Sequence, residues 1–349
     1  MSRLKRAALQ LGFQAGLFRL AERAVRRRKA VILTFHRFSG NGEGHARGMP
    51  IPTFTEYLEY LTRHYRVVSL RTLTEELSRG DVQPYTAAVT VDDGYHEVFT
   101  LAAPVLRTYG VPASFFVISD FIDGRLWPWT DRFTFVFDRA PRDRLAFTHR
   151  GSVHVLQMRE EGDRRRAAAH WLEYAKGLPA AEVDELLAAI AAAAGIEVPV
   201  APPREYRPLT WTQLRALNAE GFDVGAHTRT HPILSRVGPE QLRTEIEGCR
   251  EQMEQRLGFP VRHFAYPNGG KEDYTPEAVE QVARAGYRAA VTCVAGGNTP
   301  STSPFELRRI GAAMEGLAHF AQAISGFEHV KVRVRARLGG RRALAMVDP

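Results

Sequence analysis

Two short stretches, Thr90-Val91-Asp92-Asp93-Gly94-Tyr95 and His227-Thr228-Arg229-Thr230-His231, decide the fold predicted for this chain. Each follows an apolar run typical of a buried strand, Ala87–Val91 before the first and Phe222–Ala226 before the second. The carboxyl ends of parallel strands meet at one face of an α/β barrel, and that face carries the active site. We therefore expect the two stretches to meet there, although they lie far apart in the sequence.

The side chains of these stretches suit a hydrolytic metal site. Two histidines and one carboxylate, with an open position for water, form a known catalytic zinc arrangement. Asp93, His227 and His231 are the expected ligands, and Asp92 is the expected base beside them. Histidines four residues apart can share one side of a helical turn. Taken singly, Asp-Asp-Gly is commonly a solvated turn and such a histidine pair a surface feature, so the prediction depends on both stretches together.

Strand-like and helical stretches alternate along most of the chain, which predicts the α/β class with a parallel sheet. The strand-like runs are Val31–His36, Arg66–Leu70, Ala87–Asp92, Ala113–Ile118, Phe222–His227, His263–Pro267, Ala289–Val294 and a short Leu307–Ile310. The helical stretches are Thr53–His64, Thr72–Arg79, Glu97–Tyr109, Trp211–Glu220 with a capping box at Thr210 and Gln213, Pro239–Leu257, and one that starts at Thr275-Pro276.

One interval, residues 119–207, breaks this alternation and is interpreted as a helical insertion between the fourth and fifth strands. Helices are expected at Arg164–Lys176 and Ala180–Ala194. Trp127 and Trp129 in the insertion either line a sugar groove or pack the insertion onto the barrel. The predicted organisation is therefore a basic amphipathic helix (1–29), a barrel (30–320) that carries the insertion, and a basic tail (321–349).

The net charge of +8 lies in the tails. Residues 1–30 contain nine basic side chains and one acid, whose sum of +8 equals the charge of the whole chain, and a second basic run, Lys331–Arg342, closes the sequence. This distribution argues against a nucleic-acid-binding domain. Residues 1–29 suit a membrane-surface helix, a packing helix or, less well, an export signal. Two cysteines provide no disulfide framework, and we expect a cytoplasmic protein, peripheral to the inner membrane if residues 1–29 bind it.

A third segment, Phe264-Ala265-Tyr266-Pro267-Asn268-Gly269-Gly270, follows another strand-like run. It is either a plain turn or a turn in which Pro267 directs a backbone N–H, that of Asn268, into the pocket as an oxyanion donor.

With these three segments, residues 30–320 resemble the polysaccharide deacetylases, the NodB-homology domain of carbohydrate esterase family 4. Thr90–Gly94 is similar to the first motif of the family, His227–His231 to the second and Phe264–Gly269 to the third. The resemblance implies a distorted (β/α)7-type barrel and the removal of acetyl groups from sugars. It also implies Asp92 as general base, Asp93 and both histidines as metal ligands, and Tyr266 and Pro267 in the wall of the substrate groove.

Two positions depart from the family pattern. Ala265 stands where an arginine often orients the catalytic aspartate, and Leu307-Arg308-Arg309 stands where the last motif ends in a histidine that acts as general acid. We hypothesise that Arg309 orients Asp92; because arginine stays protonated, it cannot act as the acid. His36, at the end of the first strand, is either a catalytic or substrate-contacting residue or a structural histidine.

The function expected from these residues is metal-dependent hydrolysis of acetyl groups, N-acetyl in the first instance, on a polysaccharide or glycan precursor. Zn²⁺ is the expected metal, with Asp92 as base and a water at the metal as nucleophile. Two alternatives stay open. Glycoside hydrolysis by paired carboxylates leaves the histidines unexplained. A catalytically weak carbohydrate-binding or assembly protein of exopolysaccharide synthesis at a membrane surface would fit the missing acid histidine and the basic tails.

Overall fold

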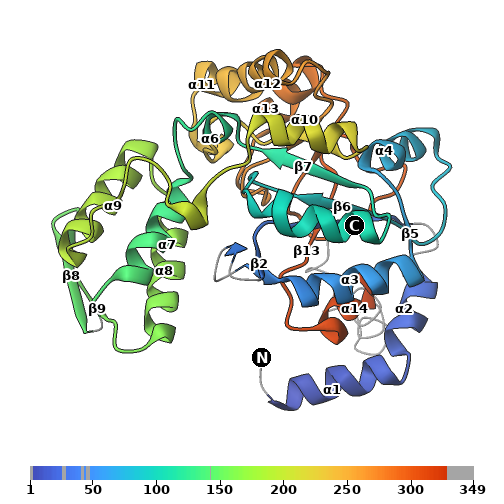
Figure 1. Ribbon diagram of the computed structural model, residues 1–349, viewed down its shortest axis with the longest axis horizontal. Coiled ribbons are helices and arrows are strands. Elements are labelled where there is room, and N and C mark those ends of the chain that lie inside the picture. The colour runs from blue at the N-terminus through green and yellow to red at the C-terminus, as the bar shows by residue number, and fades with distance from the viewer. Residues whose placement is uncertain (1–2, 26–28, 41–42, 45–47, 142, 328–349) are drawn as a thin grey trace, which may run out of the picture.

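A curled sheet of parallel strands forms the body of the molecule (Figure 1). The computed structural model describes residues 3–25, 29–40, 43–44, 48–141 and 143–327. Seven strands lie in the order β12-β11-β10-β7-β6-β1-β13, β5 pairs with β6 beside this path, and every pair is parallel. They are β1 (Val31–Phe35), β5 (Arg66–Val67), β6 (Thr86–Val91), β7 (Ala113–Val117), β10 (Asp223–Ala226), β11 (His263–Ala265), β12 (Ala289–Val291) and β13 (Ile310–Gly311). The predicted α/β class and distorted barrel are confirmed.

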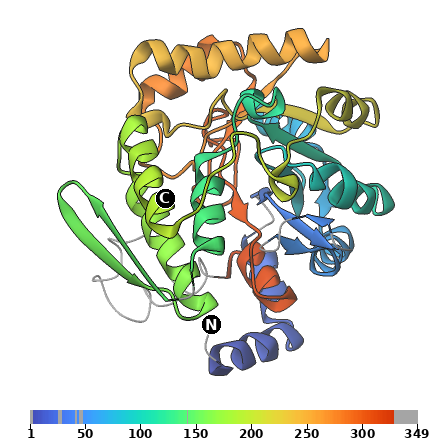
Figure 2. The same ribbon diagram turned by 60° about the vertical axis from the view of Figure 1, so that its left-hand side comes forward.

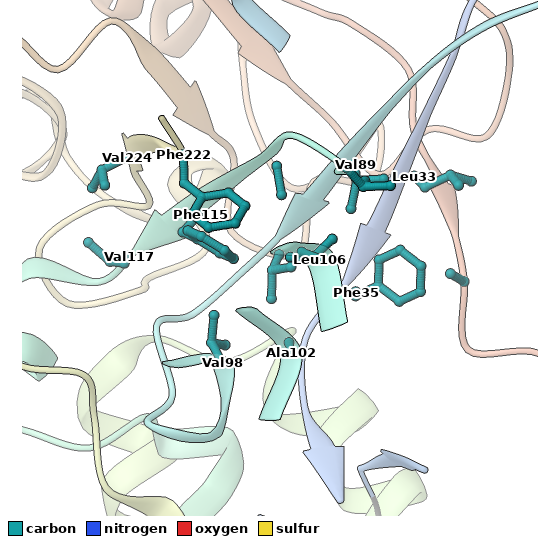
Figure 3. Packing of buried hydrophobic residues seen from close by; sticks show 14 of the residues in the cluster. Leu33, Phe35, Val89, Val98, Ala102, Leu106, Phe115, Val117, Phe222 and Val224 are labelled. Carbon is teal, nitrogen blue, oxygen red and sulfur yellow. The ribbon is translucent and has the colours of Figure 1, made fainter. Parts of the chain in front are cut away.

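Both faces of the sheet are buried, as expected for parallel strands covered by helices. Figure 3 shows one face, where Leu33, Phe35 and Val89 pack with Val98, Ala102 and Leu106 of the following helix. The alternate residues of the same strands form the second buried cluster, on the other face of the sheet: Ile32, Ala88, Phe116, Ala265 and Val291. Because neither face meets solvent, the strands are near-continuous apolar runs, and this made them recognisable in the sequence.

The helices around the sheet correspond to the predicted stretches except for the last of them, α14, which was not predicted. They are α3 (Ile51–His64), α4 (Leu70–Arg79), α5 (Ala103–Thr108), α10 (Trp211–Ala219), α11 (Pro239–Arg243), α12 (Cys249–Leu257), α13 (Pro276–Arg284) and α14 (Leu317–Ser325). The predicted capping box is present, since Gln213 N donates to Thr210 Oγ1 (3.2 Å) and Thr210 N donates to Gln213 Oε1 (2.9 Å).

Several elements differ from the predictions, among them the last strand, which is Ile310–Gly311 rather than Leu307–Ile310. The second strand ends at Val67 rather than Leu70, because Ser69 Oγ caps the next helix by accepting from Thr72 N (3.0 Å). The predicted helix 97–109 begins with a π-helical turn, η1 (Val98–Ala102), and the predicted helix 239–257 contains another, η4 (Thr244–Gly248).

The insertion forms a separate lobe with its own hydrophobic core, to the left in Figure 1. The predicted helices are α8 (Glu161–Ala175) and α9 (Ala180–Ala194). The structure adds α6 (Ser119–Ile122), α7 (Trp129–Arg139), and a hairpin of β8 (Arg144–His149) and β9 (Ser152–Gln157), which stands at the outer edge of the lobe in Figure 2. The description of the insertion as helical was therefore incomplete. The hairpin turn is Arg150-Gly151, both at positive φ (49° and 73°), as a tight two-residue turn requires.

The N-terminal region contains two helices, α1 (Arg3–Gln14) and α2 (Leu17–Val25), where one was predicted, because the chain turns at Gly16 (φ 71°). Helix α2 packs against α14, and Phe18 meets Phe327 edge to face at 5.4 Å. The boundary expected at residue 320 falls inside α14 (Leu317–Ser325). The rest of the predicted tail, residues 328–349, lies outside the described residues.

Among the helices that the structure describes, none is both long and apolar enough to cross a bilayer.

Just after β1, the short strand β2 (Phe38–Gly40) pairs with β4 (Met49–Pro50) on one side and with β3 (Glu43–Gly44) on the other. They form one side of the opening at the carboxyl end of the sheet.

Candidate active site and metal centre

The structure brings Asp93, His227 and His231 together at the carboxyl ends of β6 and β10. Asp93 Oδ1 lies 3.6 Å from His227 Nε2 and 3.8 Å from His231 Nε2. One donor atom from each residue lies within 4.8 Å of the others. Tetrahedral coordination at about 2.1 Å places neighbouring donors about 3.4 Å apart. The three side chains therefore fit a single metal ion with little movement.

The tautomers and hydrogen bonds of the two histidines also suit a metal. His227 Nδ1 lies 2.7 Å from the carbonyl oxygen of Ala265, so the imidazole donates there and leaves Nε2 free to bind. Burial, reinforced by the neighbouring His227, lowers the pKa of His231 to about 4, so its ring is neutral. Within the described residues His231 Nδ1 has no hydrogen-bond partner although it is buried. A neutral, incompletely satisfied imidazole is the form that binds a metal.

The histidines do not share a helical turn, contrary to the prediction. Residues 227–231 form an irregular loop in which Thr228 (φ 65°) and His231 (φ 62°) adopt left-handed backbone conformations. Glu245, buried in η4, accepts from the backbone N–H groups of Arg229 (2.8 Å) and Thr230 (2.9 Å) and so holds the loop. Sequence reasoning missed Glu245, because no local pattern marks a carboxylate on a distant helix as a partner of this loop.

Asp92 lies beside this cluster and is almost fully buried. Arg309 binds it with both terminal nitrogens, Nη1 to Oδ1 and Nη2 to Oδ2, each at 2.7 Å. Burial alone would raise the pKa of Asp92, but the charge of Arg309, the nearby His227 ring and the Arg309 hydrogen bond outweigh it and hold the pKa well below its usual value. Asp92 is therefore an ionised carboxylate in a dry environment.

Arg309 is held from several sides. Its Nε donates to the Thr292 carbonyl oxygen (2.8 Å) and its Nη1 to Thr90 Oγ1 (3.2 Å). Its Nη2 lies 3.4 Å from Cys293 Sγ. Ala265, where the family often has arginine, is buried and without a polar side chain. The contact expected between Arg309 and Asp92 is thus present.

His36 stands on the solvent side of Asp92. Its Nε2 lies 3.9 Å from Asp92 Oδ2, and its side chain is 48% exposed. It lines a cavity of about 500 Å³ together with Met49, Met314 and Glu315. His36 can therefore reach both Asp92 and a molecule in this cavity.

The third motif forms a tight turn after β11. Asn268 adopts φ 57°, and its backbone N–H donates to no other described residue. A backbone N–H without a protein acceptor is free to donate to a ligand, as an oxyanion donor must. Tyr266 is a correction: it is completely buried, its hydroxyl donates to the Phe305 carbonyl oxygen (3.0 Å), and it stacks on Tyr274. Tyr266 supports the turn behind Pro267, which is also buried. Tyr266 therefore cannot contact substrate directly.

A second cavity, of about 440 Å³, lies between the insertion and the barrel and reaches His231. Trp127 and Trp129 both border it, with Ile233 and Val237 on the barrel side. Trp127 is only 3% exposed, and its Nε1 donates to the Pro199 carbonyl oxygen (3.1 Å), so it serves mainly to pack the insertion. Trp129 is half-buried and has the more accessible ring.

A buried polar network that the sequence did not reveal joins the insertion to the catalytic loops. Tyr95 Oη donates to Asp131 Oδ2 (2.6 Å), and Arg37 lies 2.5 Å from Glu97 and over the Tyr95 ring. Burial raises the pKa of Asp131 to about 7, although Arg37 and the Tyr95 hydroxyl oppose the increase. The network fixes the start of α7 beside the residues that follow Asp93.

Comparison with known proteins agrees with this geometry. The family model described as polysaccharide deacetylase matches residues 79–290, more than half of the chain. The chain belongs to the polysaccharide deacetylase family. It is accordingly a deacetylase enzyme. Comparison with curated protein sequences gave no match.

Solved structures of deacetylases share the fold of this polysaccharide deacetylase. The Streptococcus pyogenes deacetylase PplD, in complex with acetate, is 17% identical, with a TM-score of 0.53 over 81% of this chain and 92% of that chain. IcaB from Ammonifex degensii is 21% identical, with a TM-score of 0.53 over 85% and 98%. BC0361, a polysaccharide deacetylase from Bacillus cereus, is 16% identical, with a TM-score of 0.52 over 85% and 69%.

Proposed function

We propose that this polysaccharide deacetylase is metal-dependent and hydrolyses N-acetyl groups of a glycan or glycan precursor. The observation that carries the proposal is the ionised, Arg309-bound Asp92 beside the Asp93, His227 and His231 cluster. An isolated Asp-Asp pair would also suit glycoside hydrolysis, but Asp93 is engaged with two imidazoles rather than free to flank a glycosidic bond.

Asp93, His227 and His231 would hold the metal, and their mixed oxygen and nitrogen donors favour Zn²⁺. A divalent ion bound there supplies Lewis acidity toward the acetyl carbonyl and lowers the pKa of a coordinated water to about 7.

The protein residues then have distinct tasks. Asp92 accepts a proton from the attacking water, and Arg309 keeps its carboxylate oriented for this step. The Asn268 N–H donates to the acetyl oxygen, which gains negative charge in the transition state. His36 Nε2, 3.9 Å from Asp92, takes up that proton and delivers it to the leaving nitrogen as the carbon–nitrogen bond breaks, which returns Asp92 to its carboxylate form. The products are acetate and a free amine.

The two cavities beside the cluster would accept the glycan on either side of the reacting acetyl group. His36 and Met314 border one cavity, and Trp129 borders the other. The half-buried Trp129 ring suits the apolar face of a sugar. We place the protein in the cytoplasm, where it would act on precursors of a surface polysaccharide.

Acetate release from N-acetylated glycan oligomers, with and without chelator, tests the proposal. We expect activity that chelator abolishes and Zn²⁺ restores. Asp92→Asn should lower kcat about 10²–10⁴-fold while metal content stays at one ion, because a general base contributes on that scale. Asp93→Ala should lose both metal and activity.

The role of His36 is tested separately. His36→Ala should lower kcat/KM about 10²-fold or more, and the exposed His170→Ala serves as the matched control. Full acetate release by Asp92→Asn, or reducing sugars released in place of acetate, would refute the proposal. Unchanged kcat/KM in His36→Ala would remove His36 from the mechanism.

A further inference from the structure

Helix α1 has two apolar faces, of which the protein uses only one. Leu9 and Phe13 pack against the main core, and the Phe13 ring lies 6.1 Å from that of Tyr60. On the opposite side Leu4 is 84% exposed and Leu11 is 66% exposed. The exposed residues Ala8 and Ala15 continue this row at the spacing of one helix face. Exposed apolar residues in a continuous row indicate an interaction surface, whereas isolated ones do not.

Helix α2 also exposes apolar side chains. Phe18 and Ala21 are buried toward α14, whereas Leu17 (42%) and Leu20 (60%) are exposed. Within the described residues, Leu4, Leu11, Leu17 and Leu20 are the only leucines exposed to this degree. We call Leu4, Leu11, Leu17 and Leu20 the leucine row.

The surroundings of the leucine row are strongly cationic. Residues 1–30 contain nine basic residues and one acid, Glu22. Glu22 is 2% exposed, accepts hydrogen bonds from the hydroxyl groups of Tyr60 (3.0 Å) and Tyr65 (2.9 Å), and pairs with Arg19 at 3.5 Å, so it offsets only one of these basic residues. Phe327, the last described residue, packs on Phe18 of α2.

We infer that α1 and α2 lie on the surface of an anionic membrane, with the leucine row among the acyl chains and the basic residues at the lipid headgroups. Exposed leucines flanked by lysine and arginine are the pattern of helices that lie in the membrane interface. Anionic lipids attract each nearby basic residue. If a second copy of the chain or the basic segment 328–349 covered the leucine row instead, residues of like charge would be brought together.

This surface adjoins the catalytic opening. Arg6 of α1 pairs with Glu315 at 3.0 Å, and Glu315 lines the cavity that contains His36. A bilayer beneath α1 would thus hold that cavity close to glycans carried at the membrane surface. The membrane contact itself does not depend on the proposed chemistry.

Co-sedimentation of the full-length protein with large unilamellar vesicles tests the inference. One set of vesicles contains phosphatidylcholine alone, and the other contains equal parts of phosphatidylcholine and phosphatidylglycerol. The wild type should bind the anionic vesicles at least ~10-fold more tightly, because several basic residues contribute. Leu4→Gln/Leu11→Gln should weaken that binding ~10-fold or more, because two apolar side chains no longer enter the acyl region.

The matched control is Val153→Gln/Val155→Gln, which removes two exposed apolar residues (71% and 45%) from β9, far from the basic region. This variant should bind as the wild type does, and both variants should release acetate from soluble oligomers at the wild-type rate. The inference is overturned if the wild type does not prefer anionic vesicles. It is also overturned if Leu4→Gln/Leu11→Gln binds anionic vesicles as tightly as the wild type does. A wild type that is a dimer in the absence of vesicles, with a monomeric Leu4→Gln/Leu11→Gln variant, would likewise overturn it.

Discussion

At the scale of single residues, the contact between Asp92 and Arg309 is central to the proposed chemistry. Both side chains are 1% exposed or less, and two hydrogen bonds of 2.7 Å join them. An unpaired charge at this depth would be costly, so the arginine is needed for folding as well as for orienting the base. Its guanidinium is itself fixed by Thr292 and Thr90, which leaves the carboxylate little freedom to rotate.

Arg309→Met should destabilise the protein by about 3–5 kcal/mol in urea unfolding, because it leaves Asp92 charged and unpaired. Arg309→Lys keeps the charge but not the two-point geometry, so we expect a reduced kcat with KM nearly unchanged. The double variant Asp92→Asn/Arg309→Met should recover much of the lost stability. If the double variant is as unstable as Arg309→Met alone, the two side chains are not coupled as described.

At the scale of elements, strand β10 and the loop after it position both histidines. Gly225 lies in β10, two residues before His227, where a Cβ atom would come within 2.5 Å of the Phe116 ring and 3.0 Å of the His263 carbonyl oxygen. Only glycine allows β7, β10 and β11 to approach this closely. The position of β10 therefore determines where His227 lies relative to Asp93.

We expect Gly225→Ala to destabilise the fold by about 1–3 kcal/mol, the usual effect of overpacking, and to weaken zinc binding. Gly238→Ala is the matched control, because nothing lies within 4 Å of its added Cβ and its φ is an ordinary −75°. Urea unfolding and zinc titration measure the two effects. Equal behaviour of the two variants would show that the close packing around Gly225 is unimportant.

At the scale of the whole molecule, the metal cluster connects distant parts of the chain. Asp93 follows β6, the histidines follow β10, and Glu245 of η4 holds the histidine loop. A ligand that binds only the folded arrangement stabilises it by mass action. Metal binding should therefore raise the stability of the entire barrel, not only that of the loops.

Zinc at 100 times its Kd should raise the free energy of unfolding by about 2.7 kcal/mol, measured by urea unfolding with zinc and with chelator. The gain should vanish in His231→Ala, which removes one ligand. His154→Ala, in the hairpin of the insertion, is the matched control and should keep it. A gain that persists in His231→Ala would place the stabilising ion elsewhere.

The sequence alone was enough to predict the barrel, its strand order along the chain and the identity of the cluster. Buried parallel strands are continuous apolar runs, so they can be located without any knowledge of long-range contacts. Asp92-Asp93 and His227 lie at the carboxyl ends of two of these runs. The contact between Arg309 and Asp92 was also anticipated, because Ala265 stands where the family often has the arginine that orients the aspartate. In the same way, the Thr210 and Gln213 box depends only on neighbouring residues.

Only the tertiary structure decided the features that depend on contacts between distant segments. Glu245 reaches the histidine loop from another helix, Tyr266 is hidden by Tyr274, and Asp131 meets Tyr95 across the boundary of the insertion. The hairpin β8–β9 and the two-faced packing of α1 likewise follow from which surfaces the rest of the chain covers. Periodicity and motifs report local preference, whereas burial and hydrogen-bond partners depend on the whole fold, and that is why these features could not be read from the sequence.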